Sequence, residues 1–235
     1  ILLLLNYLKN IRSLKTASAT HSATTVDKSA YGITRLFKVN ADIFLRTLCL
    51  VAVTLWFTRT GAAQGPQMLA VNAMLMQMFT LFSYFTDGLA FAAEALCGKY
   101  YGKGDRQMLS ISIRTFLRIG FFGALLFSAV YLILGADFLA LLSDDPSTVT
   151  IATRYSLWAV FIPIAGFLGF VWDGICIGLT HTRSMLVTML LSTALFFITY
   201  NVAFPTLHNH GLWLAFILYL LCRGITLTIL HRRFL

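Results

Sequence analysis

Charge is scarce in this sequence of 235 residues, where only 11% of the residues are charged and 58% are hydrophobic. An ordinary soluble domain carries about 25% charged residues, so the composition excludes a typical soluble globular protein. Acidic residues are the scarcer sign, with nine Asp and Glu against 18 Lys and Arg. Because backbone groups in lipid must be hydrogen-bonded within their own segment, the sequence predicts an all-α, polytopic membrane protein.

Motifs of enzymes and of metal sites are also lacking. The four cysteines are far apart in sequence and form no CxxC motif, which argues against a disulfide framework and against a zinc site. No GxxxxGK[ST] phosphate loop occurs, and neither HExxH nor GxSxG is found. We therefore expect no enzymatic activity, no metal ion and no organic cofactor.

What the chain has in abundance is long apolar segments. Six of them follow residue 40, most of them close to the roughly 20 residues that cross a bilayer, and the second is longer, about 31 residues. They are placed at Asp42–Phe57, Gln67–Cys97, Phe116–Leu134, Tyr155–Leu179, Met185–Phe204 and Leu212–Leu230. We predict a six-helix transmembrane bundle over residues 41–235, preceded by the tail of an earlier transmembrane helix (1–8) and a cytoplasmic linker (9–40).

The basic residues predict the orientation of the bundle in the membrane. One set of alternating loops holds most of them, whereas the other set holds only Arg59 and Arg154 together with several acids. Basic loops stay in the cytoplasm, so both ends of the bundle are expected there, in a multi-pass protein of the inner (plasma) membrane. The net charge of +9 then reflects topology, and no nucleic-acid partner is expected.

The second apolar segment carries two acids, Asp87 and Glu94. A carboxylate at bilayer depth costs roughly 2.5–3.5 kcal/mol on insertion scales, and such acids usually face a cavity or a partner. Gln77, Thr80 and Tyr84 precede them at helical spacing, so all five fall on one face. This stripe predicts a pathway lining; the alternative is a helix–helix contact held by side-chain hydrogen bonds. The same two interpretations apply to Asn72.

A third acid, Asp173, lies in the fourth apolar segment, at a depth similar to that of Asp87. If both acids face one cavity, their mutual repulsion makes them a proton-responsive pair. The alternative is that each is separately paired, with Arg46 or Arg223 as partner. These two arginines are also candidates for the pathway lining. The same segment holds a candidate hinge, since proline favours a kink and glycines allow close helix approach. The hinge residues are Pro163, Gly166, Gly169 and Gly174.

These segments together resemble the multidrug and toxic compound extrusion (MATE) family, in its DinF-like branch. The resemblance is carried by Asn40-Ala-Asp-Ile-Phe-Leu-Arg-Thr47, Ala70-Val-Asn72, Asp87-Gly88 with Glu94-Ala-Leu-Cys-Gly98, Gly102-Lys-Gly-Asp105 and Trp172-Asp-Gly174. It implies twelve transmembrane helices in two bundles, of which this chain is similar to the second. It also implies exchange of protons or Na⁺ for lipophilic, often cationic, small organic substrates by alternating access.

The resemblance makes Asp87, Glu94 and Asp173 the candidates for ion coupling or substrate binding. One departure weakens this assignment, because the best-known coupling aspartate of the branch lies in the first bundle. The expected partners are the lipid bilayer, the missing N-terminal six-helix bundle and a small organic substrate. Two alternatives remain open: a lipid or glycolipid flippase of the same superfamily, and a non-transporting membrane fragment.

Overall fold

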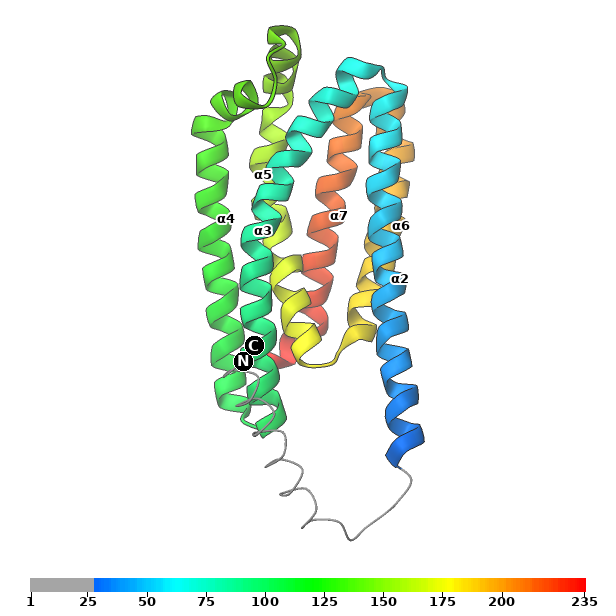
Figure 1. The fold of residues 1–235 in the computed structure, drawn as a ribbon, viewed down its shortest axis with the longest axis vertical. Helices are drawn as coiled ribbons and strands as arrows, with labels where there is room; N and C mark the ends of the chain where they lie inside the picture. The colour runs from blue at the N-terminus through cyan, green and yellow to red at the C-terminus, as the bar shows by residue number, and fades with distance from the viewer. Residues whose placement is uncertain (1–27) are drawn as a thin grey trace, which may run out of the picture. The chain divides into compact units, whose positions relative to one another are not determined.

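The computed structural model describes residues 28–235, with side chains from residue 40 onward except that of Arg233. This part of the chain is helical, and no strand occurs in it. Its elements are α2 (Lys28–Ala63), α3 (Pro66–Lys103), α4 (Arg106–Leu142), α5 (Pro146–Gly178), α6 (Thr182–Leu207), α7 (Asn209–Leu230) and the short 3-10 helix η2 (Arg232–Phe234) (Figure 1).

Six of these helices are long and apolar enough to cross a membrane, so the predicted all-α transmembrane bundle is confirmed. The predicted helix tail at 1–8 and residues 9–27 of the predicted linker lie outside the described residues. Residues 28–38 are helical and form part of a separate compact unit, and the bundle is the unit Val39–Leu235. The three-part domain division stays a prediction.

The helices extend beyond the apolar segments that predicted them. α4 begins at Arg106 instead of Phe116, because the carboxylate of Asp105 caps it by accepting from the Met108 N–H. α5 begins at Pro146 instead of Tyr155, because Asp145 accepts from the backbone N–H groups of the first turn and proline fits that turn. Both caps lie outside the hydrophobic runs, so hydropathy alone placed these starts too late.

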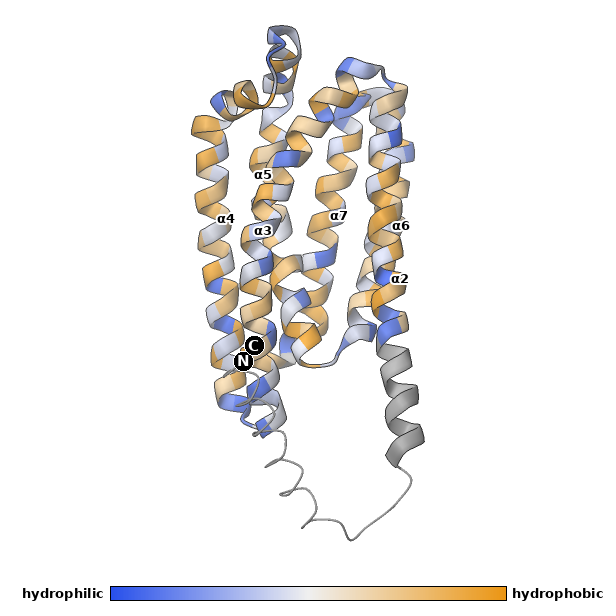
Figure 2. Cartoon of the chain, viewed as in Figure 1, coloured by the Kyte–Doolittle hydropathy of each residue, from blue (hydrophilic) through white to orange (hydrophobic). Residues whose placement is uncertain are grey.

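Helix α5 is the centre of the bundle, since it packs along α3, α4 and α7 and also contacts α6, while α6 packs along α7 (Figure 1). Within its most apolar stretch 67% of the residues are buried, against 22% for α4 and 17% for α2. α4 is nevertheless apolar along most of its length (Figure 2). Such exposed apolar surface suits contact with lipid or with further protein.

Small residues bring the central helices into backbone contact. A Cβ added to Gly174 of α5 would lie 2.1 Å from the Ala90 carbonyl oxygen of α3, and one added to Gly178 would lie 2.5 Å from the Glu94 carbonyl oxygen. On the other side of α5, a Cβ on Gly224 of α7 would lie 2.6 Å from the Leu168 Cβ. This contact places Asp173 of α5 beside the acidic face of α3.

Two apolar cores fill the bundle. The larger core includes Phe57, Phe82, Phe167, Trp213 and Phe216. The smaller core includes Ala93, Ile113, Val171, Trp172, Ile175 and Leu227. On α5 and α7 the change from one core to the other falls around Asp173 and Arg223, so these charges lie at the boundary between the two cores.

Candidate functional site

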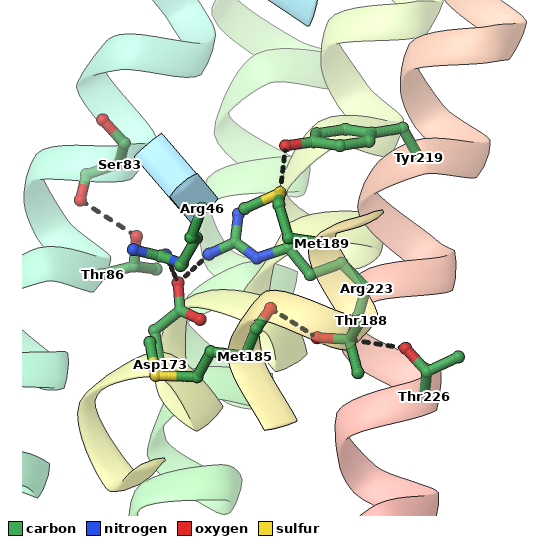
Figure 3. Close-up of polar contacts among 10 residues, drawn as sticks. All are labelled: Arg46, Ser83, Thr86, Asp173, Met185, Thr188, Met189, Tyr219, Arg223 and Thr226. Carbon is green, nitrogen blue, oxygen red and sulfur yellow. Dashed lines mark hydrogen bonds and ion pairs between the residues drawn. The ribbon is translucent and has the colours of Figure 1, made fainter. Parts of the chain in front are cut away.

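Asp173 lies between two arginines from different helices (Figure 3). Arg46 of α2 and Arg223 of α7 each donate an Nη2 N–H to the same carboxylate oxygen, Oδ2. The relative exposure of the three side chains is 18% for Arg46, 4% for Arg223 and 10% for Asp173. Asp173 therefore pairs with both of the arginines that the sequence suggested as partners. The three residues Arg46, Asp173 and Arg223 form one charged cluster.

The long side chain of Arg223 is held against α5 along its length. Its guanidinium carbon lies 5.2 Å from the ring centroid of Phe170, a cation–π contact. Gly169 makes room for the stem of the arginine, because a Cβ there would lie 3.4 Å from Nε and 3.5 Å from Cγ. One turn of α5 thus supplies the carboxylate, the aromatic face and the space that Arg223 needs.

The charged cluster is incompletely satisfied. Asp173 Oδ1, Arg46 Nε and Arg223 Nε are buried and have no hydrogen-bond partner in the described part of the protein. A buried polar atom without a partner costs about 1–3 kcal/mol, and native proteins contain few of them. Three such atoms in one cluster make it the least satisfied polar group of the described bundle.

A cavity of about 130 Å³ adjoins the cluster. Its polar lining consists of Arg46, Asp87, Glu94 and Asp173, and Phe91 and Phe170 are among its apolar walls. A cavity needs roughly 10–15 Å³ of such volume for one water, so several waters or a partly hydrated ion fit. Asp87, Glu94 and Asp173 thus line one cavity, while Asp173 is also paired with both arginines. A proton-responsive pair of Asp87 and Asp173 stays a prediction.

The charges around this cavity do not balance. With every group ionised, the carboxylates of Asp87, Glu94 and Asp173 exceed the guanidinium groups of Arg46 and Arg223 by one negative charge. Asp87 is attracted through space by both arginines. Within residues 40–235, however, neither Asp87 nor Glu94 forms one of the ion pairs found at 4.0 Å or less. The excess charge therefore belongs to α3.

The remaining residues of the predicted α3 stripe separate into two rows. Thr80, Asp87 and Glu94 are half-buried, and the Thr80 hydroxyl donates to the Met76 carbonyl oxygen at 2.9 Å. Gln77 and Tyr84 are exposed, with Tyr84 70% exposed. The 3.6-residue repeat placed all five on one face, but only the first row turns toward the neighbouring helices. Whether Gln77, Thr80 and Tyr84 line a pathway stays a prediction.

Asn72 belongs to a neutral amide cluster (Gln64, Asn72, Asn209 and Trp213) rather than to the cavity. Its Nδ2 donates to Asn209 Oδ1 and Asn209 Nδ2 donates to Asn72 Oδ1, both at 2.9 Å. Trp213 Nε1 donates to Asn72 Oδ1 at 2.9 Å, and Gln64 Nε2 donates to Asn209 Oδ1 at 3.3 Å. The structure shows Asn72 in the interhelical hydrogen bonding that was its alternative interpretation.

The hinge candidates of α5 lie inside a continuous helix. Pro163 is buried and α5 passes through it without a break. Gly166 faces the ring of Phe170, to which an added Cβ would come within 3.4 Å. Gly169 and Gly174 serve as contact points for Arg223 and α3, as described above. Bending at these positions stays a prediction.

Sequence reasoning missed Asp42 and Asn209. The Asp42 side chain is 7% exposed; it accepts from Arg183 Nη1 at 3.3 Å and from the Thr182 hydroxyl at 3.4 Å, so it ties α2 to the start of α6. The sequence feature that could have pointed to Asp42 is its four-residue spacing to Arg46, which places both charges on the same side of α2. Asn209 stands at the start of an apolar run, where a polar residue was indistinguishable from a loop residue.

Within the described residues no group of three or more His, Cys, Asp or Glu side chains could hold a metal ion.

Comparison with known proteins gives a family match over most of the bundle, because the MatE family model matches residues 41–203. The chain is 39% identical over 199 residues to DNA damage-inducible protein F of Escherichia coli, covering 85% of this chain and 43% of that protein.

A second relative is Protein DETOXIFICATION 44, chloroplastic, of Arabidopsis thaliana. It is 25% identical over 178 residues, which cover 76% of this chain and 34% of that protein. The chain therefore spans less than half the length of both relatives.

Proposed function

The chain belongs to the MatE family of polytopic membrane transporters, and on that premise we propose that it forms one half of an exporter of lipophilic organic cations. Export is driven by exchange for protons or Na⁺, with alternating access to the two sides of the membrane. Members of this family are transporters and not enzymes. The observation that carries the proposal is the cavity with three carboxylates beside the charged cluster.

The three acids take different roles in this proposal. Asp173 holds two arginines on one oxygen, so its charge is needed to keep Arg46 and Arg223 compensated in a low-dielectric interior. Asp87 and Glu94 line the same cavity without an ion-pair partner in the described chain. We assign the exchangeable proton or cation to Asp87 and Glu94, and the positioning of α2 and α7 to Asp173.

Coupling follows from the excess negative charge of the cavity. A proton or Na⁺ on Asp87 or Glu94 neutralises the excess, whereas an organic cation supplies the same compensation from the substrate side. Because burying a cation requires a counter-charge, the two occupants compete for one carboxylate set. This competition is the physical basis of an exchange, in which loading by one occupant promotes release of the other.

The flippase alternative is less well supported by the same cavity. A lipid diphosphate requires cationic side chains to receive it, and both arginines of the cluster are committed to Asp173. The exposed fraction of Arg223 is only 4%, so this arginine is also shielded from a ligand. A net negative lining favours a cationic substrate.

A second six-helix bundle is part of the proposal, since the chain covers only 43% of the length of its Escherichia coli relative. The exposed row of α3, with Tyr84 and Phe91 both 70% exposed, supports such a partner across the cavity mouth. The proposed location is the inner membrane, with the α3–α4 turn in the cytoplasm as the basic residues indicate.

The test is gradient-driven efflux of a fluorescent lipophilic cation from vesicles that contain the full-length transporter. Asp87→Asn, Glu94→Gln and Asp173→Asn are compared with wild type at equal expression. Asp137→Asn is the matched control, because Asp137 is an exposed acid of α4 that does not line the cavity.

We expect loss of gradient-driven efflux in Asp87→Asn, a smaller loss in Glu94→Gln and wild-type efflux in the control. Wild-type efflux in all three cavity variants, with the protein folded, would contradict the proposal and would move coupling outside this bundle.

A further inference from the structure

A second and larger cavity lies away from the three acids, at the turn that joins α3 to α4. It measures about 780 Å³. Its lining residues are Tyr100, Tyr101, Gly104, Asp105, Arg106, Leu109, Ser110, Arg114, Phe234 and Leu235. The lining therefore combines polar, basic and apolar side chains. This combination suits an amphiphile with an anionic head better than a purely polar or purely apolar ligand.

Among the side chains of the lining, basic groups outnumber acidic ones. The two arginines Arg106 and Arg114 stand against a single acid, Asp105, whose carboxylate already accepts from the Met108 N–H as the cap of α4. Two further cations flank the cavity on α3, Lys99 and Lys103, and the ammonium group of Lys99 lies 5.9 Å from the ring centroid of Tyr100.

Donors in this cavity already converge on an oxygen atom. Arg114 donates from Nε and Nη2 to the Leu235 carbonyl oxygen, and the Ser110 hydroxyl donates to the same atom at 3.2 Å. A guanidinium group has five N–H donors, so three of those of Arg114 are not used in this contact. With Arg106, they provide the planar donor sets that bind phosphate oxygens in pairs.

The position along the helices indicates headgroup depth. Arg114 stands two residues before Phe116, where the apolar run of α4 begins. Gly104 lies in the turn between the end of α3 and the start of α4. From Arg106 to Arg114 the axis advances about 12 Å, so the cavity extends from the aqueous side to the edge of the apolar run. Tyr100 and Tyr101 are residues typical of this interface.

We propose that this cavity binds the phosphate group of an anionic lipid, with Arg106 and Arg114 on the phosphate and with Leu109, Phe234 and Leu235 against the start of an acyl chain. The ligand bridges α3, α4 and the segment that follows α7. The site is separate from the carboxylate cavity and does not depend on the coupling ion or the exported substrate. A soluble phosphate shares the headgroup chemistry but lacks the acyl chain.

The test uses purified full-length transporter in a neutral detergent and follows thermal unfolding as ligand is added. The probes are short-chain phosphatidylglycerol, short-chain phosphatidylcholine, glycerol 3-phosphate and inorganic phosphate. The variants are Arg106→Gln and Arg114→Gln. Arg118→Gln is the matched control, because Arg118 is an exposed arginine one helical turn beyond Arg114 that does not line the cavity.

We expect phosphatidylglycerol to raise the unfolding temperature at lower concentration than phosphatidylcholine. Each lining variant should weaken its apparent affinity about fivefold, which corresponds to about 1 kcal/mol per basic residue at a membrane surface. A smaller rise of the unfolding temperature with glycerol 3-phosphate and inorganic phosphate than with phosphatidylglycerol would assign the site to lipid. Equal action of the two soluble phosphates would support the anion site and would assign it to a soluble ligand.

Two results would overturn the proposal. The first is equal stabilisation by phosphatidylcholine and phosphatidylglycerol, which would show that an anionic headgroup is not selected over a zwitterionic headgroup that carries the same phosphate. The second is an equal loss of affinity in Arg118→Gln and the two lining variants, which would show diffuse attraction to a basic surface. Both lining arginines are exposed, so neither substitution should prevent folding.

Discussion

Two of the polar clusters that join the helices of this bundle use different chemistry. The amide cluster of Gln64, Asn72, Asn209 and Trp213 is neutral, and its central hydrogen bonds are reciprocal. The charged cluster of Arg46, Asp173 and Arg223 leaves three buried polar atoms without a partner in the described chain. The two are separated by about 21 Å along α7, from Asn209 to Arg223.

Under the proposed function, this difference assigns the response to an ion to one end of the bundle. Amide and indole groups keep the same charge at every physiological pH, so a change of pH does not alter the hydrogen bonds that join α3 to α7. Carboxylates can bind a proton or a cation, and a change of charge next to Arg46 and Arg223 alters the attraction that holds α2 and α7 to α5. We infer that the amide cluster is a fixed joint and that the charged cluster with its cavity is the responsive one.

The largest effect is expected from Asp173→Asn, which leaves two arginines without their counter-charge. Removal of one partner of a buried ion pair costs about 3–5 kcal/mol, so the free energy of unfolding should fall by about that amount. Urea or thermal unfolding in detergent measures it. A triple variant, Asp173→Leu with Arg46→Met and Arg223→Met, should recover most of the stability but not coupled transport. Wild-type stability of Asp173→Asn would show that the ion pairs are not structural.

The second effect concerns the amide cluster. Asn72→Ala removes the acceptor of Asn209 Nδ2 and Trp213 Nε1, and each buried donor left without a partner costs about 1–3 kcal/mol. Gln64→Ala removes only a 3.3 Å contact from a half-buried side chain and should cost less. The loss in Asn72→Ala should be the same at pH 6 and pH 8. A loss of stability that differs between these pH values would contradict a cluster that contains no titratable group.

A third test addresses the contact that places Asp173 beside α3. Gly174→Ala sets a Cβ 2.1 Å from the Ala90 carbonyl oxygen, so α3 and α5 must move apart, and overpacking of this kind costs about 1–3 kcal/mol. Gly88→Ala on α3 is the control, since a Cβ there meets nothing within 4 Å. Equal stability and equal transport in the two variants would show that the close α3–α5 contact is not needed by the cavity.

The smallest effect is expected at the exposed cap of α5. Hydrogen bonds from the Thr148 and Ser147 hydroxyls lower the pKa of Asp145 from 3.8 to about 2. A lowered pKa stabilises the folded state above pH 3.8, and this contribution disappears as the pH falls to about 2. The difference in unfolding temperature between wild type and Asp145→Ala should therefore shrink across that interval. A difference independent of pH would exclude the charged form as the stabilising one.

The sequence predicted the helices and the acids better than it predicted their surroundings. Hydropathy located all six spans, and the cost of charge in lipid singled out Asp87, Asp173 and the two arginines that pair with Asp173. It did not locate the starts of α4 and α5, because Asp105 and Asp145 act as caps outside the apolar runs. Helical periodicity put Tyr84 on the same face as Asp87, but which part of that face a neighbour covers depends on how the helices pack.

The amide cluster is a second case in which the sequence indicated a polar residue but not its partner. Asn72 and Asn209 are 137 residues apart in sequence, and their pairing follows from the packing of α3 and α7. A single polar residue in an apolar run indicates that a partner exists, since unpaired amides in lipid are costly. It does not indicate which of the other polar residues that partner is.

The measurement that tests the central claim most directly compares two modes of transport in proteoliposomes of the full-length protein. One is gradient-driven uphill efflux of a lipophilic cation, and the other is exchange of labelled for unlabelled substrate without a gradient. If Asp87 carries the exchangeable ion, Asp87→Asn loses the uphill mode and keeps exchange, while Gln64→Ala keeps both. Uphill efflux at the wild-type rate in Asp87→Asn would contradict the assignment of coupling to the carboxylates of this bundle.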